Sequence, residues 1–340
     1  MSDLLLDPAF VSRLDRLDVL SRKILGGKLR GERLGRRRGE SMELADFRDY
    51  SAGDDPRFVD WNILARLDRL MVKLFKAEEE IFLHILLDAS GSMNFGEPNK
   101  WNYLCQVAAA LGYVGLCNGH HVRVWAISNE PHGESELLRG RGAVWRLMRF
   151  IEGLRPGGPT RFADACRRLA LRREHRGVCV VLSDFLFEDG LGDGQSQLGN
   201  QRLSTPLAQP TPTLTLPLST RGADKSADLF SHATTLGLEI GLGTLAAAGH
   251  DVFCVQALSP QETDPVETGE LRLADSESGT EAEVRISPAD IAAYGDRLAE
   301  LCGRVERQVE RHGGRFLRTQ TSVPFDLLVL EGLRRGRLVG

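Results

Sequence analysis

Short apolar runs alternate with amphipathic segments along this chain of 340 residues, and this alternation limits the possible folds more than any other feature. Residues 81–87 are almost all apolar and end in a polar, glycine-containing loop, which is typical of a buried parallel strand. Residues 121–127 and 177–182 repeat this pattern. Helical periodicity is found between and around these strands, at residues 102–116, 143–151 and 161–173. The alternation predicts an α/β fold with a doubly wound, Rossmann-like, mostly parallel sheet, helices on both faces, and ligands at the carboxyl ends of the strands.

The alternation is interrupted once and then resumes. Residues 188–235 are rich in glycine, proline, serine and threonine, and they predict a flexible insertion or linker. A helix, a strand, a helix and a strand are expected beyond it, at residues 238–248, 251–258, 289–311 and 315–321. We therefore expect one domain made of residues 79–187 and 236–335, with a small β-rich addition at residues 265–288.

Residues 1–78 are expected to form an amino-terminal extension. Apolar residues at helical spacing predict an amphipathic helix at residues 8–25 that ends at Gly26 and Gly27. Basic residues are concentrated between Arg13 and Arg38. Such a run is suited to nucleic acid, anionic lipid or an acidic partner, and it is also typical of a solvated helix face and loop.

Oxygen-bearing side chains follow the first predicted strand at alternate positions, as Asp88, Ser90 and Ser92. Oxygen ligands suit a hard cation such as Mg²⁺ or Mn²⁺, which would need further oxygens from other loops, water or a partner. Thr160 precedes a predicted helix and Asp184 follows the third predicted strand, so parallel strands would bring both to the same edge of the sheet. The sequence therefore predicts one divalent metal site formed by these five residues.

The order of these residues resembles the metal-ion-dependent adhesion site of the von Willebrand factor A family, which has the pattern D-x-S-x-S, then a threonine, then an aspartate. All five positions match. The resemblance implies an A-type version of the doubly wound fold. It also implies that Ser90 and Ser92 bind the metal directly, that Thr160 and Asp184 bind it directly or through water, and that an acidic residue of a protein partner completes the coordination.

A second block, ELADFRDYSAGDDPRFVDW at residues 43–61, resembles the bacterial domain-of-unknown-function family fifty-eight. That family typically carries E-F-x-x-L-R-x-Y-x-x-G-D-D-x-R-x-I-D-W before an A-type domain, and Leu44, Phe47 and Val59 are conservative variants of it. The likeness covers most of residues 30–335, although the insertion is longer than the connection usual in the family. The resemblance implies a MoxR-type AAA+ ATPase as the partner, in a chaperone-like pair that acts on client complexes.

The charged and aromatic residues of this block have two possible roles. In the structural interpretation they form an ion-pair network around a turn, with the tryptophan as a buried anchor. In the functional interpretation they form a docking surface beside the metal loop. The residues concerned are Arg48, Tyr50, Asp54, Asp55, Arg57, Asp60 and Trp61.

Composition and motifs argue against several classes of protein. A net charge of −4 gives no global basic excess for nucleic acid. No signal peptide and no stretch approaching roughly 18 apolar residues is present, so we expect a cytoplasmic protein without a transmembrane segment. The six cysteines contain no C-x-x-C pair and are expected to be reduced core thiols.

Catalysis is not expected. A phosphatase-type D-x-D loop would need a second aspartate where Ser90 stands, and neither a G-x-S-x-G elbow nor an H-E-x-x-H pair is present. We therefore expect a non-catalytic, divalent-metal-dependent protein–protein interaction module. The alternatives are a nucleic-acid or anionic-membrane binder that uses the amino-terminal basic run, and a metal-dependent hydrolase.

Overall fold

The chain divides into two compact units. The computed structural model describes residues 6–19, 43–51, 53–76, 81–127, 133–158, 160–172, 176–186, 213–215, 226–265, 269–274 and 281–340. Met1–Leu25 and Ile81–Gly340 form the larger unit, and Gly26–Glu80 form the smaller one. The amino-terminal helix thus belongs to the larger unit, whereas we expected it in a separate extension.

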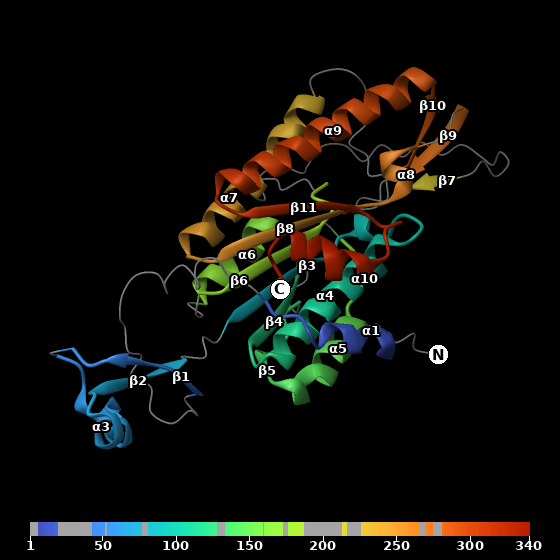
Figure 1. The fold of residues 1–340 in the computed structure, drawn as a ribbon. Coiled ribbons are helices and arrows are strands. Elements are labelled where there is room, and N and C mark those ends of the chain that lie inside the picture. The colour runs from blue at the N-terminus through green and yellow to red at the C-terminus, as the bar shows by residue number, and fades with distance from the viewer. Residues whose placement is uncertain are drawn as a thin grey trace. The chain divides into compact units, whose positions relative to one another are not determined.

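The larger unit is built on a six-stranded sheet with the strand order β11-β8-β6-β3-β4-β5 (Figure 1). Its strands are β3 (Phe82–Asp88), β4 (His121–Ile127), β5 (Leu138–Arg139), β6 (Val178–Ser183), β8 (Asp251–Leu258) and β11 (Arg315–Gln320). Neighbouring strands are parallel except β4 and β5, which are antiparallel. The predicted doubly wound, mostly parallel α/β sheet is therefore confirmed.

Helices cover both faces of this sheet because side chains of one strand alternate between the faces. Ile85 and Leu87 of β3 pack in one hydrophobic cluster, and Leu86 packs in the other. The first cluster includes residues of α1 (Pro8–Leu14), α4 (Lys100–Cys117) and α5 (Val144–Gly153), and the second includes residues of α6 (Phe162–Leu171), α7 (Ser226–Ala247) and α9 (Pro288–Arg311). Burial on both faces explains why the strands are unbroken apolar runs in the sequence.

The strand order reverses at β3. The chain runs from β3 through α4 to β4 and β5, and then returns through α5 and α6 to form β6 on the other side of β3. In doubly wound sheets the carboxyl ends of the strands at such a reversal form the usual ligand site. Here β3 ends at Asp88 and β6 ends at Ser183, so the candidate metal residues lie at this point.

Helix α1 is shorter than the predicted helix at residues 8–25. It ends at Leu14, and Asp18 and Gly340 exchange two backbone hydrogen bonds of 2.9 Å. Pairing with the carboxyl-terminal residue replaces the continuation of the helix, and the local periodicity gave no sign of it. Residues 20–42 lie outside the described part of the chain.

The predicted insertion at residues 188–235 is partly structured, so its description as a flexible segment is wrong in two places. Helix α7 begins at Ser226 instead of residue 238. Strand β7 (Thr213–Thr215) pairs with β9 (Gly269–Ala274), which also pairs with β10 (Glu281–Ile286). The small β-rich addition is therefore present and includes one strand of the insertion. The other insertion residues lie outside the described part of the chain.

The smaller unit contains an antiparallel pair of strands, β1 (Glu43–Asp49) and β2 (Met71–Lys76). The connection between them includes a 3-10 turn, η1 (Pro56–Phe58), and helix α3 (Trp61–Leu67). Asp60 caps α3, because its side chain accepts hydrogen bonds from the first-turn amides of Asn62 and Ile63.

All six cysteines are free thiols, and all but Cys117 are buried, as expected from their positions in apolar segments. Burial raises the pKa of the Cys105 thiol to about 12, so this thiol stays protonated and unreactive at neutral pH. No helix in the described part of the chain is both long and apolar enough to cross a membrane.

Candidate metal centre

The loop after β3 is fixed to the loop before α6 by backbone hydrogen bonds. The amide of Gly91 donates to the carbonyl of Gly158 at 2.9 Å, and the amide of Gly157 donates to the carbonyl of Ala89 at 2.8 Å. These bonds bring together two loops that are far apart in the sequence. As a result, Thr160 lies beside the aspartate–serine loop.

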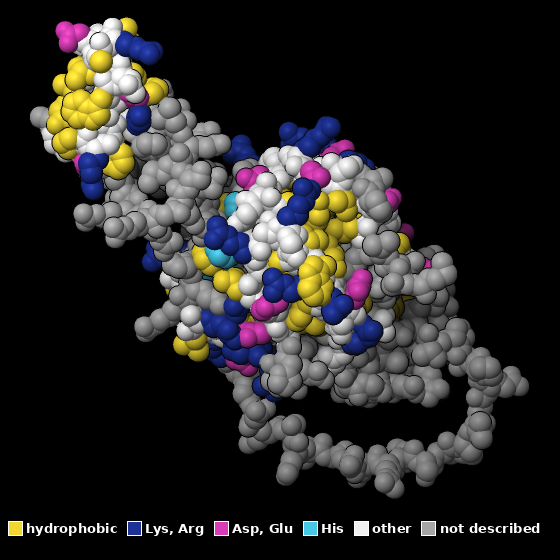
Figure 2. Space-filling model, turned by 90° about the horizontal axis from the view of Figure 1, so that it is seen from below, with side chains coloured by type: hydrophobic (Ala, Val, Ile, Leu, Met, Phe, Trp, Pro, Cys, Tyr) yellow, Lys and Arg dark blue, Asp and Glu magenta, His cyan; other side chains and the backbone are white. Residues whose placement is uncertain are grey.

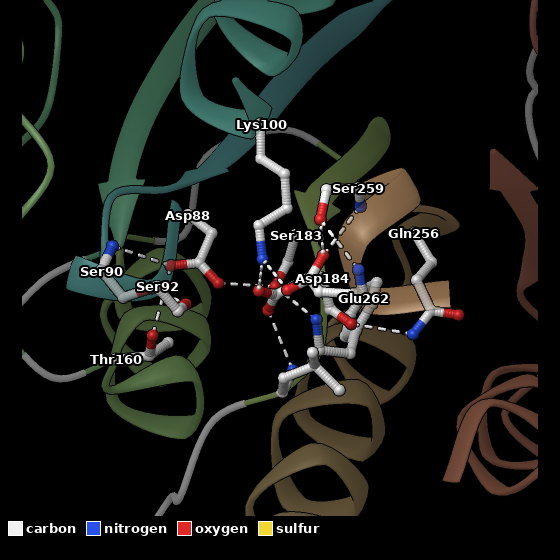
Figure 3. A network of polar contacts seen from close by, with 12 residues as sticks. Asp88, Ser90, Ser92, Lys100, Thr160, Ser183, Asp184, Gln256, Ser259 and Glu262 are labelled. Atoms are coloured by element: carbon white, nitrogen blue, oxygen red, sulfur yellow. Dashed lines mark hydrogen bonds and ion pairs between the residues drawn. The ribbon is translucent and has the colours of Figure 1, made fainter. Parts of the chain in front are cut away.

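Four of the five predicted metal residues meet at the carboxyl end of β3 (Figure 3). Oδ1 of Asp88 accepts hydrogen bonds from the amide of Ser90 at 3.0 Å and from Oγ1 of Thr160 at 3.2 Å. The hydroxyl oxygens of Ser90 and Ser92 are 3.0 Å apart. All four side chains are buried, so their oxygens face one another instead of bulk water.

This donor set fits a hard divalent cation. Every donor is an oxygen, as Mg²⁺ and Mn²⁺ prefer. An octahedral ion with bonds of about 2.1 Å places adjacent oxygens about 3 Å apart, and the two hydroxyls of Ser90 and Ser92 are separated by 3.0 Å. Among the described residues no group of three or more His, Cys, Asp or Glu side chains is arranged to hold a metal. A cation here would therefore depend on the hydroxyls.

Asp184 lies next to this cluster but its carboxylate has other partners. Oδ2 accepts a hydrogen bond from Nζ of Lys100 at 2.7 Å, and Oδ1 accepts one from the amide of Leu186 at 2.9 Å. The link to Asp88 runs through the preceding residue, because Oγ of Ser183 donates to Oδ2 of Asp88 at 2.5 Å. The carboxylate of Asp184 thus lies close enough to Asp88 to repel it, and it is hydrogen-bonded to a lysine and a backbone amide.

Lys100, the first residue of α4, is fully buried and ion-paired with two carboxylates. Its Nζ lies 2.7 Å from Asp184 and 2.5 Å from Oε1 of Glu262. Figure 3 shows the lysine side chain reaching into the cluster, with both carboxylates at its tip. Although burial opposes the charged form, the charges of Asp184 and Glu262 raise the pKa of Lys100 above its ordinary value. The ammonium is therefore charged at neutral pH.

Glu262 is positioned by a capping box at the start of α8 (Pro260–Thr263). Its Oε2 accepts hydrogen bonds from the amide of Ser259 at 2.7 Å and from Oγ of Ser259 at 2.9 Å. Burial raises the pKa of Glu262, and the Lys100 ammonium opposes this shift. The capping box leaves Oε1 free to face the ammonium.

Asp88 is electrostatically strained in the absence of a bound cation. Burial, followed by the negative charge of Asp184, raises the pKa of Asp88 to about 6. Hydrogen bonds from Ser183 and Ser90 oppose the shift. A buried carboxylate held by neutral donors beside a second carboxylate is a place where a cation would be favourable.

Sequence reasoning gave no role at this site to Lys100, Ser183, Ser259 or Glu262. The stretch Ser259-Pro260-Gln261-Glu262 has the capping-box pattern, which was a usable signal for the local turn. Nothing comparable indicated that Lys100 is buried, since lysines seldom are.

In the smaller unit, charged residues of the block at residues 43–61 form ion pairs. Arg48 donates two hydrogen bonds to Asp54, at 2.8 and 2.6 Å. Arg57 pairs with Asp55, whose side chain also caps η1. Nζ of Lys73 lies 3.1 Å from Asp60. These contacts support the structural interpretation of the charged residues.

The prediction that Trp61 anchors this segment by burial is wrong. Its side chain is 61% exposed, and Leu67 and Leu70 are 65% and 44% exposed. Figure 2 shows hydrophobic side chains gathered on the surface of this unit. Tyr50 is half-buried, and its amide donates to the carbonyl of Leu70 at 2.9 Å. The exposed tryptophan thus fits the docking interpretation.

The amino-terminal basic run is described only at its start. Arg13 forms an exposed ion pair of 3.2 Å with Asp326, and Arg16 is exposed. The other basic residues of the run lie outside the described part of the chain.

Comparisons with known proteins give the following similarities. The profile of the family described as "Protein of unknown function DUF58" matches residues 46–202. "Uncharacterized protein Rv1480" of Mycobacterium tuberculosis (strain ATCC 25618 / H37Rv) is 25% identical over 343 residues, which cover 98% of this chain and 93% of that protein. The crystal structure of the conserved hypothetical protein BatB from Bacteroides thetaiotaomicron is 11% identical with a TM-score of 0.40, covering 75% of this chain and 98% of that one. The vWF domain of the type V pili tip protein Mfa5 from Porphyromonas gingivalis is 13% identical with a TM-score of 0.39, covering 76% and 95%. The profile match confirms the resemblance to family fifty-eight.

Proposed function

We propose that this chain, whose residues 46–202 match the DUF58 family, is a non-catalytic protein-interaction module that depends on a bound divalent cation. Asp88, Ser90, Ser92 and Thr160 would hold Mg²⁺ or Mn²⁺, with Asp184 beside them. The ion would supply a positive charge that attracts an acidic side chain of a protein partner as a further ligand.

One observation carries this proposal, namely the convergence of a buried carboxylate and three hydroxyls on one point at the strand reversal. Ser90 and Ser92 place their oxygens 3.0 Å apart, and Thr160 reaches the same carboxylate from another loop. Among the described residues, Asp88 has neutral hydrogen-bond donors and no cationic partner. If the cluster served only to stabilise the loops, this buried charge would be a cost without a benefit.

The partner we propose is a MoxR-type AAA+ ATPase in the cytoplasm. Its support is the family resemblance, since no residue of this chain identifies it. The exposed Trp61 and Leu67 offer a second contact surface, because tryptophan is enriched among the interface residues that contribute most of the binding free energy.

Isothermal titration of Mg²⁺ and Mn²⁺ into the full chain tests the metal site. Wild type is expected to bind one ion per chain saturably, and a Ser90→Ala/Ser92→Ala variant is expected to lose this binding while its circular dichroism stays unchanged. Ser322→Ala, at an exposed serine that is not among the proposed ligands, is the matched control. Folded wild type that binds neither ion would reject the metal site.

Capture of the ATPase partner tests the interaction. Binding should require Mg²⁺, fail in EDTA and fail for the double serine variant. Binding that persists in EDTA and declines steeply with salt would instead favour the basic run, because contacts with exposed charges are screened by salt.

A further inference from the structure

The Lys100 ammonium is an unusual buried cation because it lies beside a site that suits a metal ion. Its side chain is fully buried, as are those of Asp184 and Glu262. Withdrawing an ammonium from water is costly unless close carboxylates and hydrogen bonds compensate it. Here two carboxylate oxygens lie within 2.7 Å, so the position is built for a cation.

Formal charges define what this cluster needs. Asp88, Asp184 and Glu262 contribute three negative charges, and Lys100 contributes one positive charge, so the sum is −2. One divalent cation at the hydroxyls would neutralise the whole cluster. Without the lysine the sum would be −3, and one divalent cation would leave an uncompensated buried carboxylate.

We propose that Lys100 acts as a tethered cation that takes the place of a second metal ion, neutralises Asp184 and limits the centre to one divalent cation. Lys100 is thus a positioning residue, and this inference rests on the proposed metal site. Its ammonium holds Oδ2 of Asp184 away from the hydroxyl cluster, so Asp88 is the one carboxylate left to face the metal.

The backbone around Lys100 is fixed in a way that supports this role. The segment before it contacts the turn that holds Glu262, through two hydrogen bonds of 3.1 Å between the backbone of Glu97 and the side chain of Gln261. Gly96 has a φ of +90°, and a Cβ there would lie 2.3 Å from Cβ of Ser259. These contacts between the loop and the turn therefore fix the position of the Lys100 ammonium relative to Glu262.

Replacing the lysine by an uncharged side chain of similar length tests the inference. Lys100→Met is expected to melt at a lower temperature than wild type in EDTA, because Asp184 and Glu262 lose their cation. In Mn²⁺ it is expected to bind two ions instead of one, and its melting temperature should rise at least twice as far as that of wild type. Ion counts come from isothermal titration, and melting temperatures from circular dichroism.

A double variant, Lys100→Met/Glu262→Gln, separates charge from packing. It removes one positive and one negative charge, so its ion count and its Mn²⁺-induced shift should return to the wild-type values. Lys100→Met that binds a single ion with the wild-type shift would overturn the inference. So would a Lys100→Met protein that stays unfolded in Mn²⁺ while the double variant folds.

The same ion counts and melting temperatures distinguish failure of this inference from failure of the proposed function. Wild type that binds no ion would reject the metal-dependent function and, with it, the basis of this inference. Wild type and Lys100→Met that each bind one ion, with equal shifts, would leave the metal-dependent function standing and overturn the tethered cation alone.

Discussion

Replacing Asp88 by asparagine is expected to stabilise the metal-free protein. Among the described residues, Asp88 accepts hydrogen bonds from the neutral donors Ser90, Thr160 and Ser183, while the nearby charge of Asp184 repels it. Asparagine keeps the shape and the oxygen that accepts from Ser90, and it removes the buried charge. The substitution therefore relieves a cost that only a bound cation would otherwise offset.

The magnitude follows from the pKa of Asp88, which rises from 3.8 to about 6. One pKa unit corresponds to about 1.4 kcal/mol, so the ionised carboxylate costs up to about 3 kcal/mol at neutral pH. Because the folded-state pKa is raised, the stability that this group contributes is fully present below pH 3.8 and is lost as pH rises through about 6. The gain from Asp88→Asn is therefore expected above about pH 6 and should disappear near pH 4.

Asp184→Asn is the matched control, and the expected sign is opposite. Asp184 accepts a hydrogen bond from the Lys100 ammonium at 2.7 Å, so the substitution leaves a buried ammonium with one carboxylate fewer. Breaking a buried ion pair by removing one partner typically costs about 3–5 kcal/mol, and Glu262 retains part of that interaction here. The same chemical change at two neighbouring carboxylates thus has opposite effects.

Urea unfolding followed by circular dichroism measures both effects. In EDTA at neutral pH the expected order of stability is Asp88→Asn, then wild type, then Asp184→Asn. Mg²⁺ at about 100 times its dissociation constant should add about 2.7 kcal/mol to wild type and nothing to Asp88→Asn. An Asp88→Asn protein that is less stable than wild type in EDTA would refute the electrostatic reasoning.

Two further predictions concern positions away from the metal centre. Trp61→Ala should change the unfolding free energy by less than about 0.5 kcal/mol, because the side chain is 61% exposed, and should weaken capture of the proposed ATPase partner. A large loss of thermal stability would mean that Trp61 is an anchor after all. Gly241→Ala should destabilise the protein by about 1–3 kcal/mol, because the new Cβ would lie 2.4 Å from the Phe162 ring. Gly243→Ala in the same helix, where His312 is 3.4 Å away, should instead stabilise it by up to about 1 kcal/mol, and the reverse order in thermal unfolding would contradict this packing.

The strands of the large sheet were predictable because burial on both faces produces unbroken apolar runs, as in β3. Boundaries that depend on distant segments were not predictable. Helix α1 stops early because Asp18 pairs with Gly340, at the other end of the chain. The first turns of α7, residues 226–235, are rich in serine, threonine and aspartate, which are poor helix formers, so composition alone favoured a linker.

The convergence of Asp88, Ser90, Ser92 and Thr160 was predictable because the loops at the carboxyl ends of parallel strands meet at one edge of the sheet. The role of Asp184 was not predictable, because it depends on Lys100. A lysine at the start of a helix normally indicates an exposed position. Its burial is compensated by Asp184, which follows β6, and by Glu262 in α8, which follows β8, and no local pattern links the three residues.

The ion pair between Asp184 and Lys100 determines the net charge at the proposed metal, and therefore whether the metal would attract an acidic side chain of a partner. A divalent ion that faces Asp88 alone keeps a formal charge of +1, which favours a further carboxylate ligand. If Asp184 also faced the ion, the formal charge would be zero and the attraction would be lost. Because these groups are buried, salt screens them far less than it screens surface charges. Metal-dependent capture is therefore expected to persist at salt concentrations that abolish binding through the exposed arginines.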